Sequence, residues 1–341
     1  MKHTIGLIGF GTVGRGICEI LLDKKNYLKE KYGFEFVITA VADFAFGNVY
    51  NPDGLDIPLM LKQANEKQKF TKDLTDYDNI KLIKNSNCDI ICELTYTDLT
   101  SGGPAIDHVR AALESGKHIV TSNKGPAALF YPEMKKIADQ NNVKFLIEGT
   151  VCAGTPVINL TDGPLAGCDI SKIRGILNGT TNYMLSEMEK GMAYEEVLKI
   201  AQELGYAEAD PTGDVEGHDA RGKVTILANI VMGAGIKITD VPCRGITKIT
   251  SEDIENAKAQ NKRWKLIGSV EKKDGKVITS VSPEMIDYSH PLAGVMGATN
   301  ALTFTTDLLG DVTIVGPGAG KIETGFSILT DILSIHRTNG K

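Results

Sequence analysis

Five acids and two basic residues gather in one short stretch, residues 205–223, which reads G-Y-A-E-A-D-P-T-G-D-V-E-G-H-D-A-R-G-K. Carboxylates can hold a substrate that carries an ammonium group, and a lysine removed from water can act as a tunable proton donor. Asp219 and Lys223 stand four residues apart, so they share one face of a helix. Two interpretations stay open: an exposed pair contributing roughly a few tenths of a kcal/mol, or an acidic pocket completed by one buried lysine.

Two expected helices flank this stretch and must position its side chains. Apolar residues recur at helical spacing over residues 194–204, and Gly205 is placed to end that helix. The second helix begins near Asp219 and continues through V-T-I-L-A-N-I-V-M, with Lys223 on or beside its apolar stripe. Glycine and proline interrupt the sequence between the helices, so the acids are expected in a folded loop. A charge on a core-facing stripe needs a partner or a function.

A glycine-rich turn near the N-terminus predicts a dinucleotide site. An apolar strand over residues 4–8 leads into Gly9-x-Gly11-x-x-Gly14, and a helix is expected over residues 13–22. In this context a pyrophosphate binds at the helix N-terminus, where free N–H groups point at it. The charged segment 23–35 lengthens the connection to a second strand, 36–42. That strand ends at Asp43, whose carboxylate is placed to accept hydrogen bonds from the adenosine ribose.

The remaining pattern divides the chain into two domains. Residues 1–150 alternate strands and helices, which predicts a Rossmann-type, doubly wound α/β sheet for dinucleotide binding. The further strands are expected at 90–94, 117–121 and 143–147, and the helices at 105–115 and 131–141. Residues 44–74 form a polar insertion that is loop-like or helical. Segments rich in β-branched residues, at 173–177, 277–282, 302–306 and 312–315, predict an α+β domain over 151–320 with a mixed or antiparallel sheet. The C-terminal segment 321–341, with a helix over 323–336, is expected to return to the first domain.

Composition favours a cytoplasmic protein with a small-molecule substrate. The 341 residues are 42% hydrophobic and 23% charged, and the net charge of −6 without a basic run argues against nucleic acid or an anionic membrane as partner. The longest apolar run, 224–236, is too short to span a bilayer, and the N-terminus has no signal-peptide pattern. Six scattered cysteines are expected to be free thiols in a reducing compartment.

Taken together, the motifs resemble the homoserine dehydrogenase family, and the match runs through nearly the whole chain. The matching segments are G-F-G-T-V-G at 9–14, T-S-N-K-G-P at 121–126, E-G-T-V-C-A-G-T-P at 148–156, N-G-T-T-N-Y at 178–183, the acidic block at 203–223 and G-P-G-A-G at 316–320. The resemblance implies interconversion of L-aspartate 4-semialdehyde and L-homoserine with NAD or NADP. It also implies a homodimer whose second domain supplies the dimer sheet and the substrate pocket.

The resemblance assigns roles residue by residue. It implies that Lys223 transfers the proton with Asp219 beside it, and that Lys124 lies between cofactor and substrate. The substrate-binding residues that it implies are Glu208, Asp214, Thr180, Tyr206 and Gly205. The implied cofactor-binding residues are Gly9, Phe10, Gly11, Thr12, Val13, Gly14, Asp43, Thr95, Lys124 and Gly320. A monovalent cation, Na⁺ or K⁺, is implied at Glu148 with the backbone carbonyls of Val151, Ala153 and Thr155.

Three features depart from the family pattern. Cys152 stands where the family usually has glycine, and His218 stands where an aliphatic residue is common. The sequence shows no regulatory or kinase extension, so inhibition by threonine is not expected.

The cofactor and the substrate each leave alternatives. NAD is favoured over NADP because Asp43 would repel a 2′-phosphate and the nearest basic residue downstream is Lys62, although Arg15 or a lysine from 62–72 could reduce the repulsion. Two other functions stay open: an oxidoreductase acting on another small amino acid, and a dinucleotide-binding sensor without turnover. The sensor is disfavoured because it would need only the glycines of the first domain.

Overall fold

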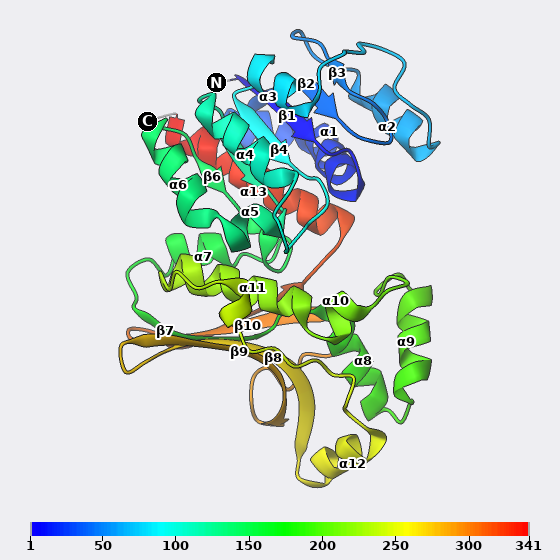
Figure 1. Ribbon diagram of the computed structural model, residues 1–341, viewed down its shortest axis with the longest axis vertical. Helices are drawn as coiled ribbons and strands as arrows, with labels where there is room; N and C mark the ends of the chain where they lie inside the picture. Colours follow the sequence, from blue (N-terminus) through cyan, green and yellow to red (C-terminus); the bar gives the residue numbers. More distant parts are fainter. Residues whose placement is uncertain (1, 340–341) are drawn as a thin grey trace. The chain divides into compact units, whose positions relative to one another are not determined.

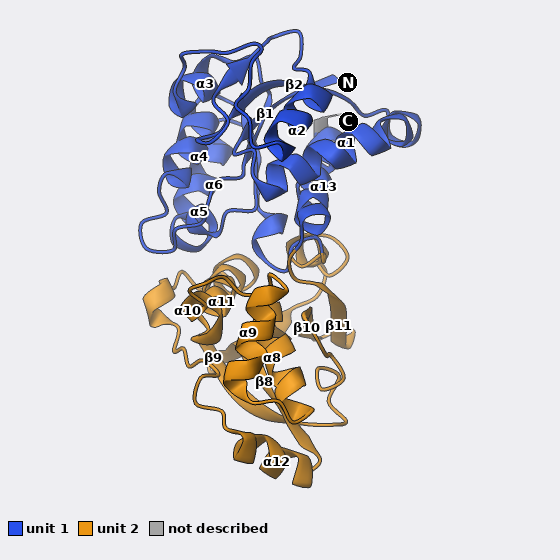
Figure 2. Cartoon of the chain, turned by 90° about the vertical axis from the view of Figure 1, so that its right-hand side faces the viewer, with its two compact units in different colours: residues 1–154, 320–341 blue, residues 155–319 orange. Residues whose placement is uncertain are grey.

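The fold was obtained as a computed structural model, which describes residues 2–339. The chain divides into two compact units, which Figure 2 distinguishes by colour. Unit 1 comprises Met1–Gly154 and Gly320–Lys341, and unit 2 comprises Thr155–Ala319. Each unit has its own sheet and its own apolar core.

Unit 1 is built on a six-stranded sheet in the order β3-β2-β1-β4-β5-β6 (Figure 1). The strands are β1 (Lys2–Ile8), β2 (Glu35–Ala42), β3 (Val49–Tyr50), β4 (Ile90–Glu93), β5 (His118–Thr121) and β6 (Phe145–Leu146). All neighbours pair in parallel except β3, which is antiparallel to β2. The strand order reverses between β1 and β4, and doubly wound sheets bind their ligands outside the carboxyl ends of the strands at such a switch point.

The helices of unit 1 cover this sheet. They are α1 (Thr12–Tyr32), α2 (Ile57–Asn65), α3 (Asn79–Asn85), α4 (Ala105–Glu114), α5 (Lys124–Leu129), α6 (Tyr131–Gln140), the 3₁₀ turn η1 (Glu148–Thr150) and α13 (Lys321–Asn339). The C-terminal helix α13 lies beside α1 (Figure 1), and its Ile328 and Ile332 belong to the same buried core as Ile5 and Leu7 of β1. The long apolar strands are possible because both faces of the sheet are covered.

Two expectations for unit 1 need correction or completion. Helix α1 does not end near residue 22 but continues to Tyr32, because Leu28 packs into the core and Gly33, at φ +64°, ends the helix. The charged segment 23–35 is therefore mostly helix rather than a connection. Residues 44–74 contain β3 and α2, and the carboxylate of Asp56 caps α2 at Leu59 N.

Unit 2 contains a five-stranded sheet in the order β11-β10-β7-β8-β9. The strands are β7 (Ile170–Ile176), β8 (Lys262–Lys273), β9 (Lys276–Asp287), β10 (Thr299–Thr306) and β11 (Gly310–Pro317). Every neighbouring pair is antiparallel, so of the two expected kinds of sheet the mixed one is excluded. The sequence patterns did not reveal β8, because it carries many charges. The sequence does contain one indication of β8, the dipeptide Asp274–Gly275. Both residues have positive φ, as a two-residue hairpin turn between β8 and β9 requires.

Helix α11 packs on one face of this sheet. The helices of unit 2 are α7 (Ile158–Asp162), α8 (Gly179–Glu189), α9 (Tyr194–Glu203), α10 (Thr212–Val215), α11 (His218–Val231) and α12 (Ser251–Ala259), with a 3₁₀ turn η2 (Ile238–Asp240). Gly268 of β8 lies against α11, since an added Cβ there would come 2.8 Å from Val224 Cγ2. Residues that pair with Gly268 across the sheet therefore face α11, and their neighbours along each strand face away from it.

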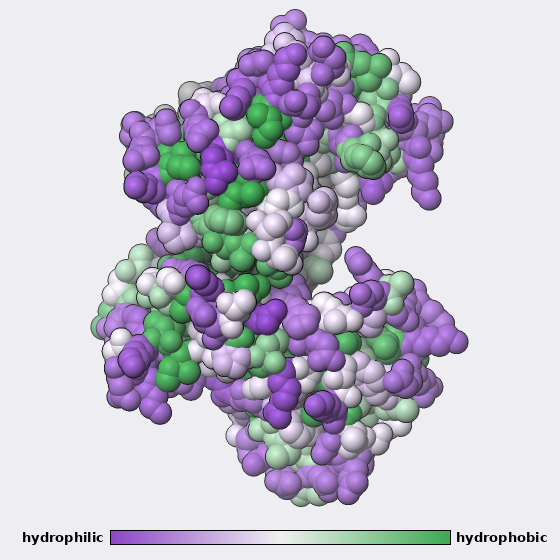
Figure 3. All heavy atoms as spheres, viewed as in Figure 1, coloured by the Kyte–Doolittle hydropathy of each residue, from purple (hydrophilic) through white to green (hydrophobic). Residues whose placement is uncertain are grey.

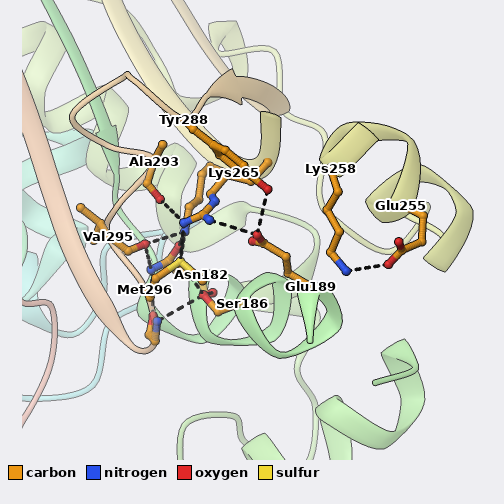
Figure 4. Close-up of polar contacts among 12 residues, drawn as sticks. Asn182, Ser186, Glu189, Glu255, Lys258, Lys265, Tyr288, Ala293, Val295 and Met296 are labelled. Carbon is orange, nitrogen blue, oxygen red and sulfur yellow. Dashed lines mark hydrogen bonds and ion pairs between the residues drawn. The ribbon is translucent and has the colours of Figure 1, made fainter. Parts of the chain in front are cut away.

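A buried basic cluster ties the segment before β10 to β8 and α8 (Figure 4). Lys265 of β8 is 1% exposed, and its Nζ donates to Asn182 Oδ1 at 2.8 Å and to Val295 O. Arg263 on the same strand donates to Ala293 O at 2.7 Å. Burial, and secondarily the charge of Arg263, lower the pKa of Lys265 from 10.5 to about 8.

Hydrophilic side chains cover much of the visible surface of each unit, with apolar patches between them (Figure 3). Within residues 2–339, no helix is both long and apolar enough to cross a membrane.

Candidate active site

The lysine–aspartate pair that the sequence singled out is buried in unit 2. Gly217, at φ +82°, precedes α11, so Asp219 lies in the first turn and Lys223 one turn later. The Nζ of Lys223 donates to Asp219 Oδ2 and to Leu177 O, both at 2.6 Å. The side chains are 8% and 22% exposed for Lys223 and Asp219, respectively. The structure therefore supports the buried lysine rather than the exposed surface pair.

Asn178 gathers the acids of this site, and the sequence analysis did not single it out. Its Nδ2 donates to Asp214 Oδ1 at 2.7 Å and to Asp219 Oδ2 at 3.0 Å. Its Oδ1 accepts from Thr181 N at 2.9 Å and so caps the N-terminus of α8. The available signal was an asparagine between a β-branched strand and a helix, which is typical of an N-cap. One amide thus fixes the start of a helix and orients two carboxylates.

The loop after α9 brings Tyr206 and Thr180 together. Gly205, at φ +74°, ends α9 as expected, and the hydroxyl of Thr180 then donates to Tyr206 O at 2.6 Å. The ring of Tyr206 is partly exposed and meets that of Tyr183 edge-on, with centroids 5.1 Å apart. Glu208 is exposed on the same loop, and its side chain takes no part in the described hydrogen bonds around Asn178.

The glycine turn of unit 1 has the geometry that a dinucleotide needs. Gly9 has φ +105°, and an added Cβ would lie 2.6 Å from the carbonyl oxygen of the residue after β4. At Gly14 an added Cβ would lie 2.4 Å from Gly9 O, whereas at Gly11 nothing lies within 4 Å. Gly9 and Gly14 are thus required by packing, and Gly11 leaves open space at the N-terminus of α1, where Thr12 and Val13 begin the helix. These residues fit a bound pyrophosphate.

Asp43 joins the end of β2 to the glycine turn. Its Oδ2 accepts from Phe10 N at 2.7 Å, and its Oδ1 accepts from Ala45 N at 2.8 Å. Oδ1 also accepts from Phe46 N at 3.2 Å, so Oδ2 is the oxygen that can accept a further hydrogen bond from a ribose. Arg15 is held nearby, with its NH1 donating to Asn65 Oδ1 at 3.1 Å.

The start of α13 packs closely against α1. An added Cβ at Gly16 of α1 would lie 2.2 Å from Lys321 O, and one at Gly325 of α13 would lie 2.8 Å from Ile17 N. Gly320, at φ +141°, immediately precedes α13. The close approach places Gly320 beside the first turns of α1, which follow the glycine turn.

The carboxyl ends of β4 and β5 are tied by Asn123. Its Nδ2 donates to the backbone oxygens of Thr95 at 3.2 Å and Tyr96 at 2.8 Å, and its Oδ1 caps α5 at Gly125 N. Lys124 is the first residue of α5, half-buried, at the same sheet edge. The structure thus brings Thr95 and Lys124 to neighbouring positions at the edge where such sheets bind ligands.

The segment expected to hold a cation is tightly turned. Glu148 is 2% exposed, and its N–H donates to Asp331 Oδ2 at 3.0 Å. Cys152 and Ala153 both adopt left-handed backbone, at φ +57° and +50°. This region favours glycine, which explains why Cys152 is a departure from the family pattern. Val151 is fully buried, and Thr155 begins unit 2 with its hydroxyl donating to Pro317 O.

The cysteines and His218 were the remaining features noted in the sequence. All six cysteines are free thiols, as expected. Within the described part of the chain, no group of three or more His, Cys, Asp or Glu residues could hold a metal ion. The Nδ1 of His218 is buried and makes no hydrogen bond within residues 2–339, and we have no physical account of it.

Comparisons with known proteins agree with this geometry. The family model described as "Homoserine dehydrogenase" matches residues 156–333, and "Homoserine dehydrogenase, NAD binding domain" matches residues 9–148. The NAD(+)-dependent homoserine dehydrogenase of Pseudomonas canavaninivorans is 45% identical, with 99% of this chain and 97% of that protein covered. The homoserine dehydrogenase of Methanocaldococcus jannaschii is 43% identical, with 98% and 99% covered.

Solved structures give the same result. The crystal structure of a putative homoserine dehydrogenase from Archaeoglobus fulgidus matches with a TM-score of 0.88 and 38% identity, covering 98% of this chain and 99% of that one. A hyperthermophilic archaeal homoserine dehydrogenase mutant in complex with NADPH matches with a TM-score of 0.85 and 30% identity, covering 99% and 98%. Because both family models and these relatives together extend over nearly all of its length, the chain belongs to the homoserine dehydrogenase family.

Proposed function

We propose that this chain interconverts L-homoserine and L-aspartate 4-semialdehyde, with Lys223 as the proton carrier and NAD as the preferred cofactor. The observation that carries the proposal is the buried Lys223 ammonium, bonded to Asp219 and Leu177 O within 2.6 Å, beside acids that Asn178 orients. A buried amine with a carboxylate partner is suited to holding a proton and releasing it during a reaction. The family models and relatives do not favour the two alternative functions.

The residues act on the charge that develops at the substrate oxygen. The nicotinamide cofactor supplies the hydride in the reducing direction and accepts it in the oxidising direction. As the aldehyde carbon gains the hydride, its oxygen becomes negative, and Lys223 donates a proton from Nζ to that oxygen. Lys124 stabilises the same negative charge by its ammonium group. In the oxidising direction Lys223 takes the hydroxyl proton, and its Nζ keeps the hydrogen bond to Leu177 O as it cycles.

The acids of unit 2 bind the rest of the substrate in this proposal. Glu208 and Asp214 hold the amino and hydroxyl ends, while Gly205, Tyr206 and Thr180 line the pocket. Support comes from the two hydrogen bonds of Asn178, which keep Asp214 and Asp219 at one place. The Asn178 amide carries no charge, so it orients Asp214 without cancelling the negative charge that attracts an ammonium group, whereas Asp219 is paired with Lys223.

NAD binding follows the glycine turn and Asp43. We assign the pyrophosphate to the N-terminus of α1 and the adenosine ribose to Asp43, with Thr95, Lys124 and Gly320 completing the cofactor site. The preference for NAD rests on the carboxylate at residue 43, which repels a 2′-phosphate. The name of the Pseudomonas canavaninivorans relative, NAD(+)-dependent, supports it, although another relative was solved with NADPH.

A monovalent cation and a homodimer belong to the same proposal. The buried Glu148 and the tight turn at Cys152 and Ala153 support a Na⁺ or K⁺ site with the carbonyls of Val151, Ala153 and Thr155. The homodimer is supported by the sheet face of unit 2 that points away from α11. The strand pairing places Ile278 and Val315 on this face, and these apolar side chains are 52% and 56% exposed. We place the enzyme in the cytoplasm, as its free thiols favour.

The test is a substrate panel followed by absorbance at 340 nm. L-Homoserine, L-serine and L-threonine are offered with NAD and with NADP. Turnover of L-homoserine well above the other two supports the proposal. Turnover of another amino acid instead would identify a related oxidoreductase, and cofactor binding without any turnover would identify a sensor.

A further inference from the structure

One buried acid of unit 1 has no role in the reaction described above. Glu93, the last residue of β4, is fully buried at the switch point of the sheet. Its Oε1 accepts from Thr95 N at 3.3 Å, from the Thr95 hydroxyl and from His108 Nδ1 at 3.3 Å. Within residues 2–339, no lysine or arginine forms an ion pair with it. Among the described residues, His108 is therefore the basic side chain that pairs with this carboxylate.

A chain of side-chain amides assigns the donor and acceptor nitrogens of His108, and it starts from backbone atoms. The Oδ1 of Asn48 accepts from Asp43 N at 3.1 Å, and its Nδ2 donates to Tyr77 O at 2.8 Å. A backbone N–H can only donate and a backbone carbonyl can only accept, so the orientation of the Asn48 amide is settled. Its Nδ2 also lies 3.4 Å from Asn79, which must present Oδ1 there.

The orientation of Asn79 then determines the histidine. Since the Asn79 Oδ1 faces Asn48, its Nδ2 faces His108 Nε2, at 3.2 Å. An N–H donor at that distance requires Nε2 to be an acceptor without a proton. The single proton of the neutral ring is then on Nδ1, where it is donated to Glu93 Oε1. Nδ1 is therefore the His108 atom that donates to Glu93, and no lysine or arginine of residues 2–339 forms an ion pair with this carboxylate.

The Glu93 carboxylate lies where a negative charge would distinguish the two forms of the cofactor. The adenosine half belongs to the β2 side, where Asp43 ends the strand, so the nicotinamide half belongs to the β4 side of the switch point. NAD⁺ and NADH differ in charge only at the nicotinamide ring, which is cationic in the oxidised form. We propose that Glu93 is a specificity-determining residue whose buried charge makes the site favour NAD⁺ relative to NADH. The proposal rests on the dinucleotide site of unit 1 proposed above.

The test measures binding of three ligands to the whole protein in the absence of substrate. Dissociation constants for NAD⁺, NADH and ADP-ribose are determined by calorimetry for the wild type and Glu93→Gln, which removes the charge and keeps the shape. We expect the Kd for NAD⁺ to rise about tenfold, whereas the values for NADH and ADP-ribose change by less than about twofold. Thr121→Val is the matched control: it removes a hydroxyl that donates to Glu93 O at 2.7 Å, accepts from Asn123 N and lies 3.5 Å from Glu93 Oε2, but it keeps the carboxylate, so the NAD⁺/NADH ratio should be preserved.

The outcomes separate this inference from the site on which it rests. Equal weakening of all three ligands in Glu93→Gln would mean that the residue only maintains the local structure, and an unchanged NAD⁺ affinity would likewise overturn the proposal. Failure of the wild type to bind any of the three would instead refute the dinucleotide site. If Glu93→Gln does not fold, His108→Lys places an ammonium beside the carboxylate, and it must cause the same selective loss of NAD⁺.

Discussion

Asn178 is the residue on which the geometry of the catalytic acids depends. It donates one hydrogen bond to Asp214 and one to Asp219, and Asp219 in turn accepts from Lys223. Hydrogen bonds to charged groups are worth more than those between neutral groups, because the full charge takes part. The proposed proton carrier, Lys223, is therefore positioned through Asn178, which contacts its partner Asp219 rather than the lysine itself.

Asn178→Ser separates the two tasks of this side chain. Serine is a good N-cap, so α8 should persist, whereas the short hydroxyl cannot reach both acids. We expect kcat/KM for homoserine to fall roughly tenfold to a hundredfold, with the melting temperature nearly unchanged. Asn178→Ala, which loses both tasks, should also lower the melting temperature. An unaltered kcat/KM in the serine variant would show that the acids need no such support.

In unit 1, Asp43 at the end of β2 is the residue that we propose to govern cofactor choice. Its carboxylate close to a 2′-phosphate would cost on the order of 1–4 kcal/mol, which corresponds to about fivefold to several-hundredfold in affinity. We expect higher kcat/KM with NAD than with NADP for the wild type, and a shift toward NADP in Asp43→Ser. The serine variant also loses the acceptor for Phe10 N, so a moderate loss with both cofactors is expected. Equal or better use of NADP by the wild type would refute the assignment.

At the scale of elements, the buried Lys265 on β8 makes the stability of unit 2 depend on pH. Its pKa is lowered from 10.5 to about 8, so between these values the unfolded chain binds a proton that the folded chain has released. Stability then rises with pH in this window, and below about pH 8 the folded state bears the cost of a buried charge. The side chain nevertheless anchors the segment before β10 through Asn182 and Val295 (Figure 4).

Lys265→Met should abolish this dependence. The gain in unfolding free energy from about pH 7 to about pH 10 should be larger in the wild type than in the variant by on the order of 2–3 kcal/mol. Urea unfolding at both pH values measures it, and Lys276→Met, at an exposed position of β9, is the control that should follow the wild type. Parallel pH profiles for wild type and Lys265→Met would contradict the assigned cause.

Several elements could be predicted from the sequence because their signals are local. The glycine turn, the strand ending at Asp43 and the helix that carries Asp219 and Lys223 each follow from spacing and turn residues within one segment. Strand β8 was missed because its many charges hide the alternation, and only its antiparallel partners give it a place in the sheet. The sequence predicts an end of α1 near residue 22, which is too early, because the last turns of this helix are stabilised mainly by the tertiary burial of Leu28.

At the scale of the whole molecule, the sequence predicts candidate residues for the chemistry but not the residues that orient them. Lys223, Asp219 and Asp214 stand within one segment, whereas Asn178 reaches them from another part of the chain. The amide chain from Asp43 to Glu93 likewise joins side chains from separate loops and helices. Such contacts are set by tertiary packing, and no single-segment pattern contains them.

In the proposed mechanism, unit 1 binds the cofactor and unit 2 carries the proton donor, and one experiment can distinguish these two roles. The proposed cofactor residues, from Gly9 to Asp43, lie in unit 1, and the proton carrier Lys223 lies in unit 2. A change at Lys223 should therefore affect turnover and leave dinucleotide binding intact.

The most direct measurement of the central claim is homoserine oxidation by the wild type and by Lys223→Ala, with NADH binding measured on both proteins. The wild type should reduce NAD in the presence of L-homoserine, and the variant should show kcat lowered by roughly 10²–10⁴-fold with nearly the same Kd for NADH. A variant within a few-fold of wild-type turnover would exclude Lys223 as the proton carrier, and absence of homoserine oxidation in the wild type would contradict the proposed function itself.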